Sequence, residues 1–369
     1  MSDRARLRAA FLISAKGWRG SGTSFGKVAA GLQDRGHDVL VISVSDSVTH
    51  GFQSLGVPTR QLILGDTGLR EARAVRAELR AHRAQVLMAD TPRDARLAVL
   101  ASRGLGCAAV YRFNVVRDAL RNDLGNRFLL SGLSLVVYQG DAVRRRAIEG
   151  APWIGRRRSA LVPNGFDTER FRPDPEAGAA MRQRWGIASD RPVVMFAGHL
   201  SKQKAPEHAV DAIAAILPRT PSPIFVVVGR GALDGEVRQR TAAAGIETVM
   251  TGTMSPEEMP AVYNAADILL HPSRWEILPN VVGEAMACGC AVIASDADGT
   301  RELTGDDAAL LAAPGDIGGF AAHLESLLKD TRRRSRLGAA ARSRIVHEFP
   351  VRRMVDGYEA LFASLARRR

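Results

Sequence analysis

Ten short runs of apolar, largely β-branched residues recur along the chain, separated by longer stretches with helical periodicity. Runs without polar alternation are typical of strands buried on both faces, as in a parallel sheet. We therefore expect an α/β fold with two consecutive doubly wound, Rossmann-like domains. The predicted strands cover residues 8–15, 37–44, 84–90, 107–113 and 133–139, and then residues 192–198, 223–229, 247–253, 267–273 and 290–295.

The length of 369 residues suits two domains of about 150 residues better than one or four. A stretch rich in proline, glycine and charge at residues 163–178 indicates the junction. We expect a first domain at 1–168 and a second at 169–350. The remaining segment, about 351–369, has apolar residues at helical spacing and should dock as a helix: Val355, Tyr358, Leu361, Phe362 and Leu365.

No apolar run approaches the roughly 20 residues that a membrane span needs. The N-terminal AAFLIS lacks a cleavage site of small residues, so a first strand is favoured over a signal peptide. The three cysteines, Cys107, Cys288 and Cys290, have the spacing of neither a disulfide framework nor a zinc site. We therefore expect a cytoplasmic protein with free thiols and no metal.

The net charge of +12 is concentrated in the first domain. Residues 1–168 hold 26 basic and 14 acidic side chains, whereas residues 169–369 hold 25 of each. This asymmetry favours an anionic partner, either an acidic substrate or an acidic membrane surface. Nucleic acid is disfavoured, because there is no basic strand interleaved with aromatic residues and only 5% of residues are aromatic.

Two basic segments could contact such a partner. Residues 69–84 predict a helix with five arginines at helical spacing: Arg70, Arg73, Arg76, Arg80 and Arg83. Its other face is mostly alanine, which favours an ordinary solvated surface helix over one that lies at a membrane interface. Trp153 and Ile154, which precede three arginines, are the second candidate contact, and an ordinary structural role is again the alternative.

Two loops after predicted strands could bind phosphate. Residues 15–32 are glycine-rich, and Gly20 and Gly22 could let the backbone approach an anion at a helix N-terminus, although a plain tight turn fits as well. Residues 196–209 place Lys204 just before a helix predicted for 205–217, so a side-chain charge would add to the helix dipole. A solvated loop lysine is the simpler alternative.

The most informative segment is residues 271–295. Asn280 can cap a helix that starts at Val281 and that Gly289 can end. Glu276 would lie in the loop before this helix, and Glu284 one turn inside it. Two carboxylates that flank several backbone N–H groups suit a polyhydroxylated ligand with a phosphate between its hydroxyl groups.

Together these segments resemble the retaining nucleotide-sugar glycosyltransferases of family 4, which have the GT-B fold. The resemblance covers nearly the whole chain and is firmest at residues 161–173, 197–212, 227–238, 251–276 and 276–295. Glu276 and Glu284 match the E-x7-E signature of the family. The resemblance implies two domains that face a central cleft. It also implies transfer of a sugar from a nucleoside-diphosphate sugar to a hydroxyl acceptor without a metal, and a C-terminal helix that returns to the first domain.

The family pattern also implies roles for individual residues. Lys204 and His199 would act at the departing diphosphate, and Glu276 would contact hydroxyls of the donor sugar. The remaining donor-binding residues implied by the resemblance are Gly20, Gly22, Thr251, Gly252, Thr253, Met254, Ile277, Leu278, Pro279, Asn280 and Glu284. Arg112 and Asn114 are the acceptor-side candidates, at the place of a histidine in the family.

The chain departs from the family pattern at two positions beside the donor site. His199 stands where the family has arginine, and a neutral imidazole helps a diphosphate less than a fixed guanidinium does. Ile277 replaces the usual glycine and narrows the space beside the sugar.

Other functions remain compatible with the sequence. A GT-B phosphorylase or epimerase, or a non-catalytic protein that binds nucleotide-sugar or membrane, would share the fold. The acceptor is expected to be anionic, in a glycan or in a lipid at the inner membrane face, with a neutral or cationic natural product as the runner-up. The sequence leaves the base, the sugar and the oligomeric state open.

Overall fold

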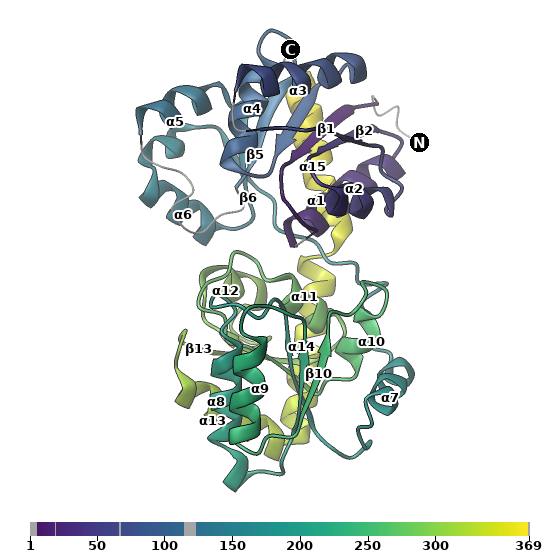
Figure 1. Cartoon of the computed structure of the whole chain (residues 1–369), viewed down its shortest axis with the longest axis vertical. Helices are drawn as coiled ribbons and strands as arrows, with labels where there is room; N and C mark the ends of the chain where they lie inside the picture. Colours follow the sequence, from purple (N-terminus) through teal and green to yellow (C-terminus); the bar gives the residue numbers. More distant parts are fainter. Residues whose placement is uncertain (1–5, 19, 66–67, 114–122, 368–369) are drawn as a thin grey trace. The chain divides into compact units, whose positions relative to one another are not determined.

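The structure is a computed structural model that describes residues 6–18, 20–65, 68–113 and 123–367 (Figure 1). The chain divides into two compact units. Unit 1 comprises Met1–Gly165 together with Val351–Arg369, and unit 2 comprises Phe166–Pro350. The first unit therefore ends slightly before the boundary expected at residue 168.

Unit 1 contains a parallel sheet of seven strands in the order β3-β2-β1-β4-β5-β6-β7. The order reverses between β1 and β4, which is the arrangement of a doubly wound sheet. Its strands are β1 (Arg8–Ile13), β2 (Asp38–Ser43), β3 (Thr59–Gln61), β4 (Val86–Ala89), β5 (Ala108–Arg112), β6 (Leu135–Tyr138) and β7 (Ser159–Leu161). Its helices are α1 (Gly20–Asp34), α2 (Asp46–Gln53), α3 (Leu69–His82), α4 (Pro92–Ser102), α5 (Leu124–Leu129), α6 (Asp141–Gly150) and α15 (Val351–Ala366).

Unit 2 contains a parallel sheet of six strands in the order β10-β9-β8-β11-β12-β13. Its strands are β8 (Val193–Ala197), β9 (Ile224–Val228), β10 (Thr248–Gly252), β11 (Ile268–His271), β12 (Ala291–Ser295) and β13 (Leu310–Ala312). Its helices are α7 (Pro175–Arg184), α8 (Pro206–Ala214), α9 (Asp234–Ala243), α10 (Met259–Asn264), α11 (Asn280–Ala287), α12 (Asp298–Thr304), α13 (Ile317–Lys329) and α14 (Thr331–Glu348). One apolar cluster joins the sheet to α8, α9 and α13, and another joins its opposite face to α10, α11 and α14.

All ten predicted strands are present, and the doubly wound α/β fold class is confirmed. Three strands were not predicted: β3, β7 and β13. Each has only three residues and lies at the edge of its sheet, where at least one residue is only partly buried. An edge strand needs no continuous apolar run, so the periodicity that indicates buried strands is absent there.

Two of the predicted helices differ in detail from the observed ones. The helix predicted for 205–217 is α8, which ends at Ala214 and is followed by a separate 3-10 turn at Leu217–Arg219. The basic helix predicted for 69–84 is α3, which ends at His82. Its buried residues are Ala72, Val75 and Leu79, and the helix packs against α4.

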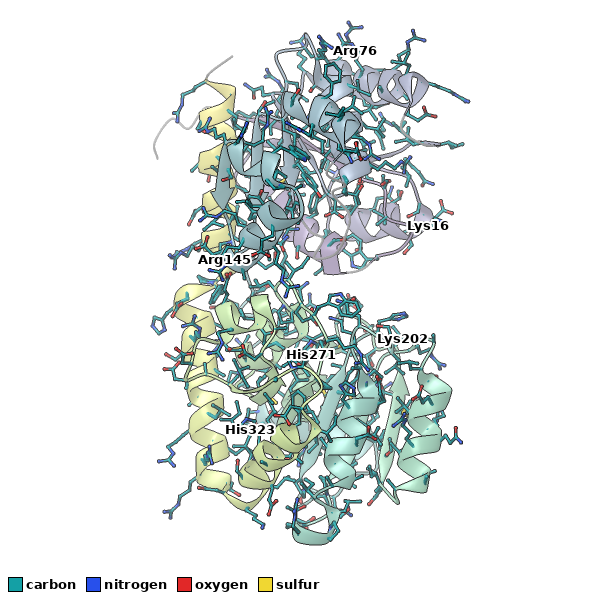
Figure 2. The ribbon with its side chains drawn as sticks, turned by 90° about the vertical axis from the view of Figure 1, so that its left-hand side faces the viewer. Lys16, Arg76, Arg145, Lys202, His271 and His323 are labelled. Carbon is teal, nitrogen blue, oxygen red and sulfur yellow. The ribbon has the colours of Figure 1, made fainter. Side chains whose placement is uncertain are left out.

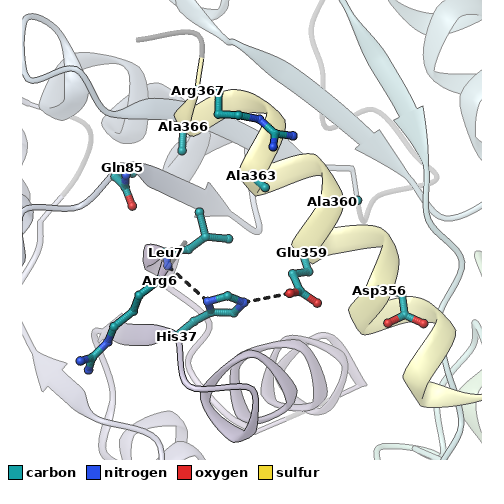
Figure 3. Close-up of a pocket in the computed structure, with 10 residues that line it drawn as sticks. All are labelled: Arg6, Leu7, His37, Gln85, Asp356, Glu359, Ala360, Ala363, Ala366 and Arg367. Atoms are coloured by element: carbon teal, nitrogen blue, oxygen red, sulfur yellow. Dashed lines mark hydrogen bonds and ion pairs between the residues drawn. The ribbon is translucent and has the colours of Figure 1, made fainter. Parts of the chain in front are cut away.

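The C-terminal helix α15 packs against α1 on one face of the unit 1 sheet. Phe362 is fully buried, and its ring lies 6.2 Å from that of Phe11 on β1. Figure 3 shows the polar side of the same contact, where His37 lies between Leu7 and Glu359 of α15. The His37 Nδ1 atom accepts from the Leu7 N–H at 3.2 Å, so Nε2 carries the proton and donates to Glu359 at 3.2 Å.

Replacing Phe362 by alanine should destabilise unit 1, because it removes a fully buried ring and leaves a cavity. We expect a loss of about 3–5 kcal/mol in the free energy of unfolding of unit 1. Hydrogen exchange resolved by mass spectrometry should show faster exchange in β1 and β4 and unchanged exchange in β8 and β9.

The matched control is Phe128→Ala, the same chemical change at a side chain that is 76% exposed in the same unit. Phe128→Ala should change the rate of hydrogen exchange in β1 and β4 only slightly. Faster exchange confined to unit 2 in the Phe362→Ala variant would contradict the assignment of α15 to unit 1.

Candidate functional site

The carboxyl ends of β8, β9 and β10 form one edge of unit 2, and backbone contacts join their loops. The Gly198 N–H donates to Val228 at 2.9 Å, and the Gly229 N–H donates to Gly252 at 2.8 Å. A Cβ atom at Gly229 would lie only 2.0 Å from the Gly198 carbonyl oxygen. The loops therefore approach so closely that glycine is required at this position, where φ is +128°.

Lys204 lies in the loop between β8 and α8, at the point where that helix begins. The next residue, Ala205, has φ of +48°, a left-handed conformation that is unusual for alanine. This turn directs the Lys204 ammonium back toward the loop after β11, where its Nζ donates to Glu276 Oε1 at 2.5 Å. Lys202, two residues earlier, is exposed and is labelled in Figure 2.

Glu276 is a buried carboxylate with two donors on a single oxygen atom. His271, the fully buried last residue of β11, lies with Nε2 2.8 Å from Glu276 Oε1 and 2.9 Å from the Ser273 hydroxyl. Burial opposes ionisation of Glu276, but the Lys204 ammonium and the His271 hydrogen bond lower its pKa to about 2. Burial lowers the pKa of His271, so this histidine is a neutral donor near pH 7.

Helix α11 begins at Asn280, with Pro279 in the N-cap position and no side-chain cap. The prediction that Asn280 caps a helix starting at Val281 was therefore wrong by one residue. Proline is tolerated at the N-cap position, because the first N–H groups of a helix lack intrahelical partners in any case. Gly289, with φ of +76°, ends the helix as predicted.

Glu284 lies on α11 and is oriented by a hydrogen bond from α10. Its Oε2 accepts from the Tyr263 hydroxyl at 3.0 Å, and Tyr263 is 1% exposed. At the preceding residue, Gly283, the Phe166 ring packs directly against the helix, and a Cβ atom there would be 2.1 Å from the ring. In the loop before α11, the Ile277 carbonyl packs directly against Gly299 in the first turn of α12, where a Cβ atom would lie 1.1 Å from the carbonyl oxygen.

The residues expected to hold a base lie at the end of β10. Thr251 and Gly252 complete that strand, and Thr253 and Met254 follow it. His199 is exposed in the loop after β8. The structure thus brings Lys204 and Glu276 into contact, and it places the other unit 2 candidates at the end of β10, in the adjoining loops or on α11.

The remaining candidates belong to unit 1. Gly20 is the first residue of α1, and Gly22 lies in the first turn, where a Cβ atom would be 3.1 Å from the Trp18 ring. Arg112 ends β5 and is 1% exposed, and its guanidinium hydrogen-bonds Asn164 and lies 5.3 Å from the Phe25 ring centre. Asn114 lies outside the described residues.

Three functional neighbours were not singled out in the sequence: His271, Ser273 and Tyr263. His271 and Ser273 follow directly on a predicted strand, so their position at the carboxyl edge was a usable signal. Tyr263 had no such signal, because it comes from α10 and meets Glu284 only through packing. Among the described residues, no group of three or more potential ligands is arranged to hold a metal ion.

The low pKa of Glu276 predicts a specific pH dependence of stability. Its ionised form stabilises the folded protein above its ordinary pKa of 4.5, and this contribution is lost as the pH falls toward 2. The stability advantage of the wild type over Glu276→Gln should therefore shrink between about pH 5 and about pH 3. Urea denaturation of both proteins across this range measures the difference, and a pH-independent difference would contradict the ion pair.

Two family models match the chain, one in each half. The model described as "Glycosyltransferase Family 4" matches residues 18–170, and the model described as "Glycosyl transferases group 1" matches residues 179–344. The second match contains Lys204, Glu276 and Glu284.

Curated relatives match part of the chain at about one-third identity. A GDP-mannose-dependent alpha-(1-6)-phosphatidylinositol monomannoside mannosyltransferase of Mycolicibacterium smegmatis is 32% identical over 49% of this chain and 50% of its own length. The 2-deoxystreptamine glucosyltransferase of Streptomyces kanamyceticus is 33% identical over 46% of this chain and 45% of its own. The D-inositol 3-phosphate glycosyltransferase of Nocardia farcinica is 35% identical over 61% of this chain and 51% of its own. The chain thus spans about half the length of the curated relatives it matches.

Solved structures match the whole chain at lower identity. The crystal structure of Anabaena HepE in complex with UDP has a TM-score of 0.84 at 20% identity, covering 97% of this chain and 100% of that one. A glycosyltransferase from Rickettsia africae has a TM-score of 0.85 at 16% identity, covering 98% and 99%. These similarities show the shared fold. Because the two family models together match most of the chain, the resemblance inferred from the motifs is confirmed: the protein belongs to the family 4 glycosyltransferases and has the GT-B fold.

Proposed function

We propose that the protein is a retaining glycosyltransferase that moves a sugar from a nucleoside-diphosphate sugar to a hydroxyl acceptor without a metal. The observation that carries the proposal is the contact between Lys204 and the buried carboxylate of Glu276 at the carboxyl edge of unit 2. This edge is where ligands bind in open α/β sheets. Relatives named as glycosyltransferases with about one-third identity support the same activity.

The leaving diphosphate needs fixed positive charge, because its negative charge grows in the transition state. The Lys204 side chain is 21% exposed, so it is not fully enclosed by the protein beside Glu276. The N-terminus of α11 adds first-turn N–H groups and the positive end of a helix dipole. Together they provide stabilisation from side chain and backbone, with no step that requires a metal ion.

Glu276 suits a positioning role better than a nucleophilic one. Its Oε1 already receives hydrogen bonds from Lys204 and His271, and a carboxylate with a pKa near 2 is a weak nucleophile. An ionised carboxylate accepts hydrogen bonds from sugar hydroxyls. In the family, retention is usually explained by front-face attack, with the leaving phosphate accepting the proton of the acceptor, and this geometry is compatible with that route.

Lys204→Ala should lower the transfer rate by about two orders of magnitude or more, because it removes a charge that acts on the leaving group. Lys202→Ala is the matched control, since it removes an exposed lysine from the same loop. We expect Lys202→Ala to retain the rate within a factor of about three. Sugar transfer from labelled UDP- and GDP-sugars to an acceptor mixture, with chelator present, measures both variants.

Two results would contradict transferase activity. Release of sugar 1-phosphate from a glycoside by free phosphate would indicate a phosphorylase. Tight binding of a nucleotide-sugar without turnover on any acceptor would indicate a non-catalytic binding protein. Equal transfer rates for Lys204→Ala and Lys202→Ala would be compatible with transferase activity. They would show, however, that Lys204 does not act on the leaving diphosphate.

We further propose an anionic acceptor or an acidic membrane surface as the partner of unit 1. Among the described residues, the exposed large apolar side chains all lie in unit 1, which also carries the excess positive charge: Leu55, Ile63, Leu69, Leu124, Phe128 and Leu161. Exposed apolar side chains beside basic ones are typical of surfaces that contact lipid. Among those residues, no helix is both long and apolar enough to span a bilayer.

The structure narrows the basic surface that the sequence indicated. Trp153 and Ile154 are 7% and 1% exposed, so the expectation that they contact a partner was wrong. Arg76 donates to the carbonyls of Ala101 and Arg103 at the end of α4 and is therefore structural. Arg70, Arg73 and Arg80 remain as the exposed arginines of α3 itself. The names of two relatives include an inositol compound that carries phosphate, which agrees with an anionic acceptor.

Changing Arg70, Arg73 and Arg80 together to glutamine should weaken binding to anionic phospholipid vesicles by about tenfold or more at low salt, because each arginine interacts with the surface charge. The matched control changes three exposed arginines of unit 2 to glutamine: Arg332, Arg333 and Arg336. Co-sedimentation with vesicles should separate the two variants. An equal loss of vesicle binding in both variants would show that binding depends only on the net charge of the protein. It would contradict a membrane-binding surface on α3.

A further inference from the structure

We propose that Arg274 is a positioning residue that holds Lys204 in place for its action on the leaving diphosphate. The inference rests on the proposed nucleotide-sugar function and adds a residue to that site. Arg274 lies in the loop after β11, two residues before Glu276. None of the roles inferred from the sequence belongs to it.

Two hydrogen bonds join the Arg274 loop to the loop that carries Lys204. The Arg274 N–H donates to the Gln203 carbonyl oxygen at 2.8 Å. In the other direction, the Gln203 side-chain amide donates to the Trp275 carbonyl oxygen at 3.2 Å. The residue just before Lys204 is therefore tied to the two residues just before Glu276.

The Arg274 side chain adds contacts on both sides of Lys204. Its Nε donates to the Lys202 carbonyl oxygen at 3.0 Å, and its Nη2 donates to Glu207 Oε1, in the first turn of α8, at 2.9 Å. Nη2 also lies 3.1 Å from His208 Nε2. Burial and the Arg274 charge lower the pKa of His208, so its neutral ring can accept this hydrogen bond near pH 7. One guanidinium thus spans the whole segment around Lys204.

The Arg274 loop is a fixed support for these contacts. His271 and Ser273 are both fully buried, and the His271 Nε2 atom lies 2.9 Å from the Ser273 hydroxyl. The same ring nitrogen lies 2.8 Å from Glu276 Oε1. Arg274 is therefore flanked by side chains that the fold holds in place, and its guanidinium passes this fixed position on to the residues around Lys204.

The Lys204 loop needs such support, because its backbone is strained. Ala205 has φ of +48°, and a residue other than glycine keeps a left-handed conformation only where surrounding contacts enforce it. The contacts of Arg274 lie on both sides of this residue, at Lys202 and Glu207. The Lys204 side chain is also long and flexible, so fixing its backbone lowers the entropy cost of holding its ammonium in one place.

Arg274 lines a surface pocket that is separate from the Lys204–Glu276 contact. Its side chain is 44% exposed and borders this pocket between the starts of α8 and α9, together with Glu207. Among the described residues that line the pocket, neither Lys204 nor Glu276 is present. This placement fits a residue that acts through Lys204 rather than one that touches the donor.

The test measures sugar transfer from labelled UDP- and GDP-sugars to the acceptor mixture used for the lysine variants. Because Lys204 acts in the transition state, misplacing it should lower kcat more than it changes the KM of the donor. We expect Arg274→Ala to lower kcat about tenfold or more and to change the donor KM by less than about threefold. Arg274→Lys should also lower kcat, because one ammonium cannot hold the Lys202 carbonyl and Glu207 together.

A double-mutant cycle shows whether Arg274 acts through Lys204. In the Lys204→Ala background, adding Arg274→Ala should lower kcat by less than about threefold, because the group that Arg274 positions is already absent. A residue that merely stabilised the fold would cause the same loss in both backgrounds.

Arg240→Ala is the matched control. Arg240 is 42% exposed, lines the same pocket and pairs with Asp211 of α8 at 3.2 Å, so it resembles Arg274 in exposure and in its acidic partner. It lies on α9, and its described partners, Asp211 and Glu236, are outside the Lys204 loop. Arg240→Ala should retain kcat within about twofold. Thermal melting of each variant checks that the fold is intact.

Three kinds of result would overturn the proposal. An unchanged kcat in Arg274→Ala beside an active wild type, whatever the donor KM, would show that Lys204 needs no such support. An equal loss with and without the Lys204 side chain, or unfolding of both Arg274 variants, would assign Arg274 to stability alone. A wild type that transfers no sugar from any donor would overturn the proposed function itself, and the positioning role with it.

Discussion

Both units depend on one constraint, which is that every strand in each sheet runs parallel to its neighbours. A parallel sheet must be covered on both faces and gathers the carboxyl ends of its strands along one edge. In unit 2 this edge brings together loops that are far apart in sequence, and close backbone contacts at Gly198, Gly229 and Gly231 fix them. Lys204 and Glu276 are positioned by this edge rather than by direct neighbours in the chain.

The electrostatics of unit 2 follow from burying one carboxylate beside one ammonium group. Glu276 remains ionised in a buried place because Lys204 and His271 donate to it, and the fold preserves that charge without a ligand. The Lys204–Glu276 contact is therefore arranged before any ligand arrives. Preorganised charge of this kind costs no reorganisation during a reaction.

The sequence predicted the fold better than the details of the site. Buried strands and the end of α11 at Gly289 were readable because they depend on local patterns of apolar residues and on a single backbone conformation. The edge strands, the roles of His271 and Tyr263 and the burial of Trp153 were not, because they depend on packing between distant segments.

The central claim is that the carboxyl edge of the unit 2 sheet binds a nucleoside diphosphate. Hydrogen exchange of the wild type with and without UDP, GDP, ADP or TDP, resolved to short peptides, tests it most directly. We expect slower exchange with at least one nucleotide in the loops after β8, β9 and β10 and at the start of α11. Protection confined to unit 1, or no protection with any of the four nucleotides, would contradict it.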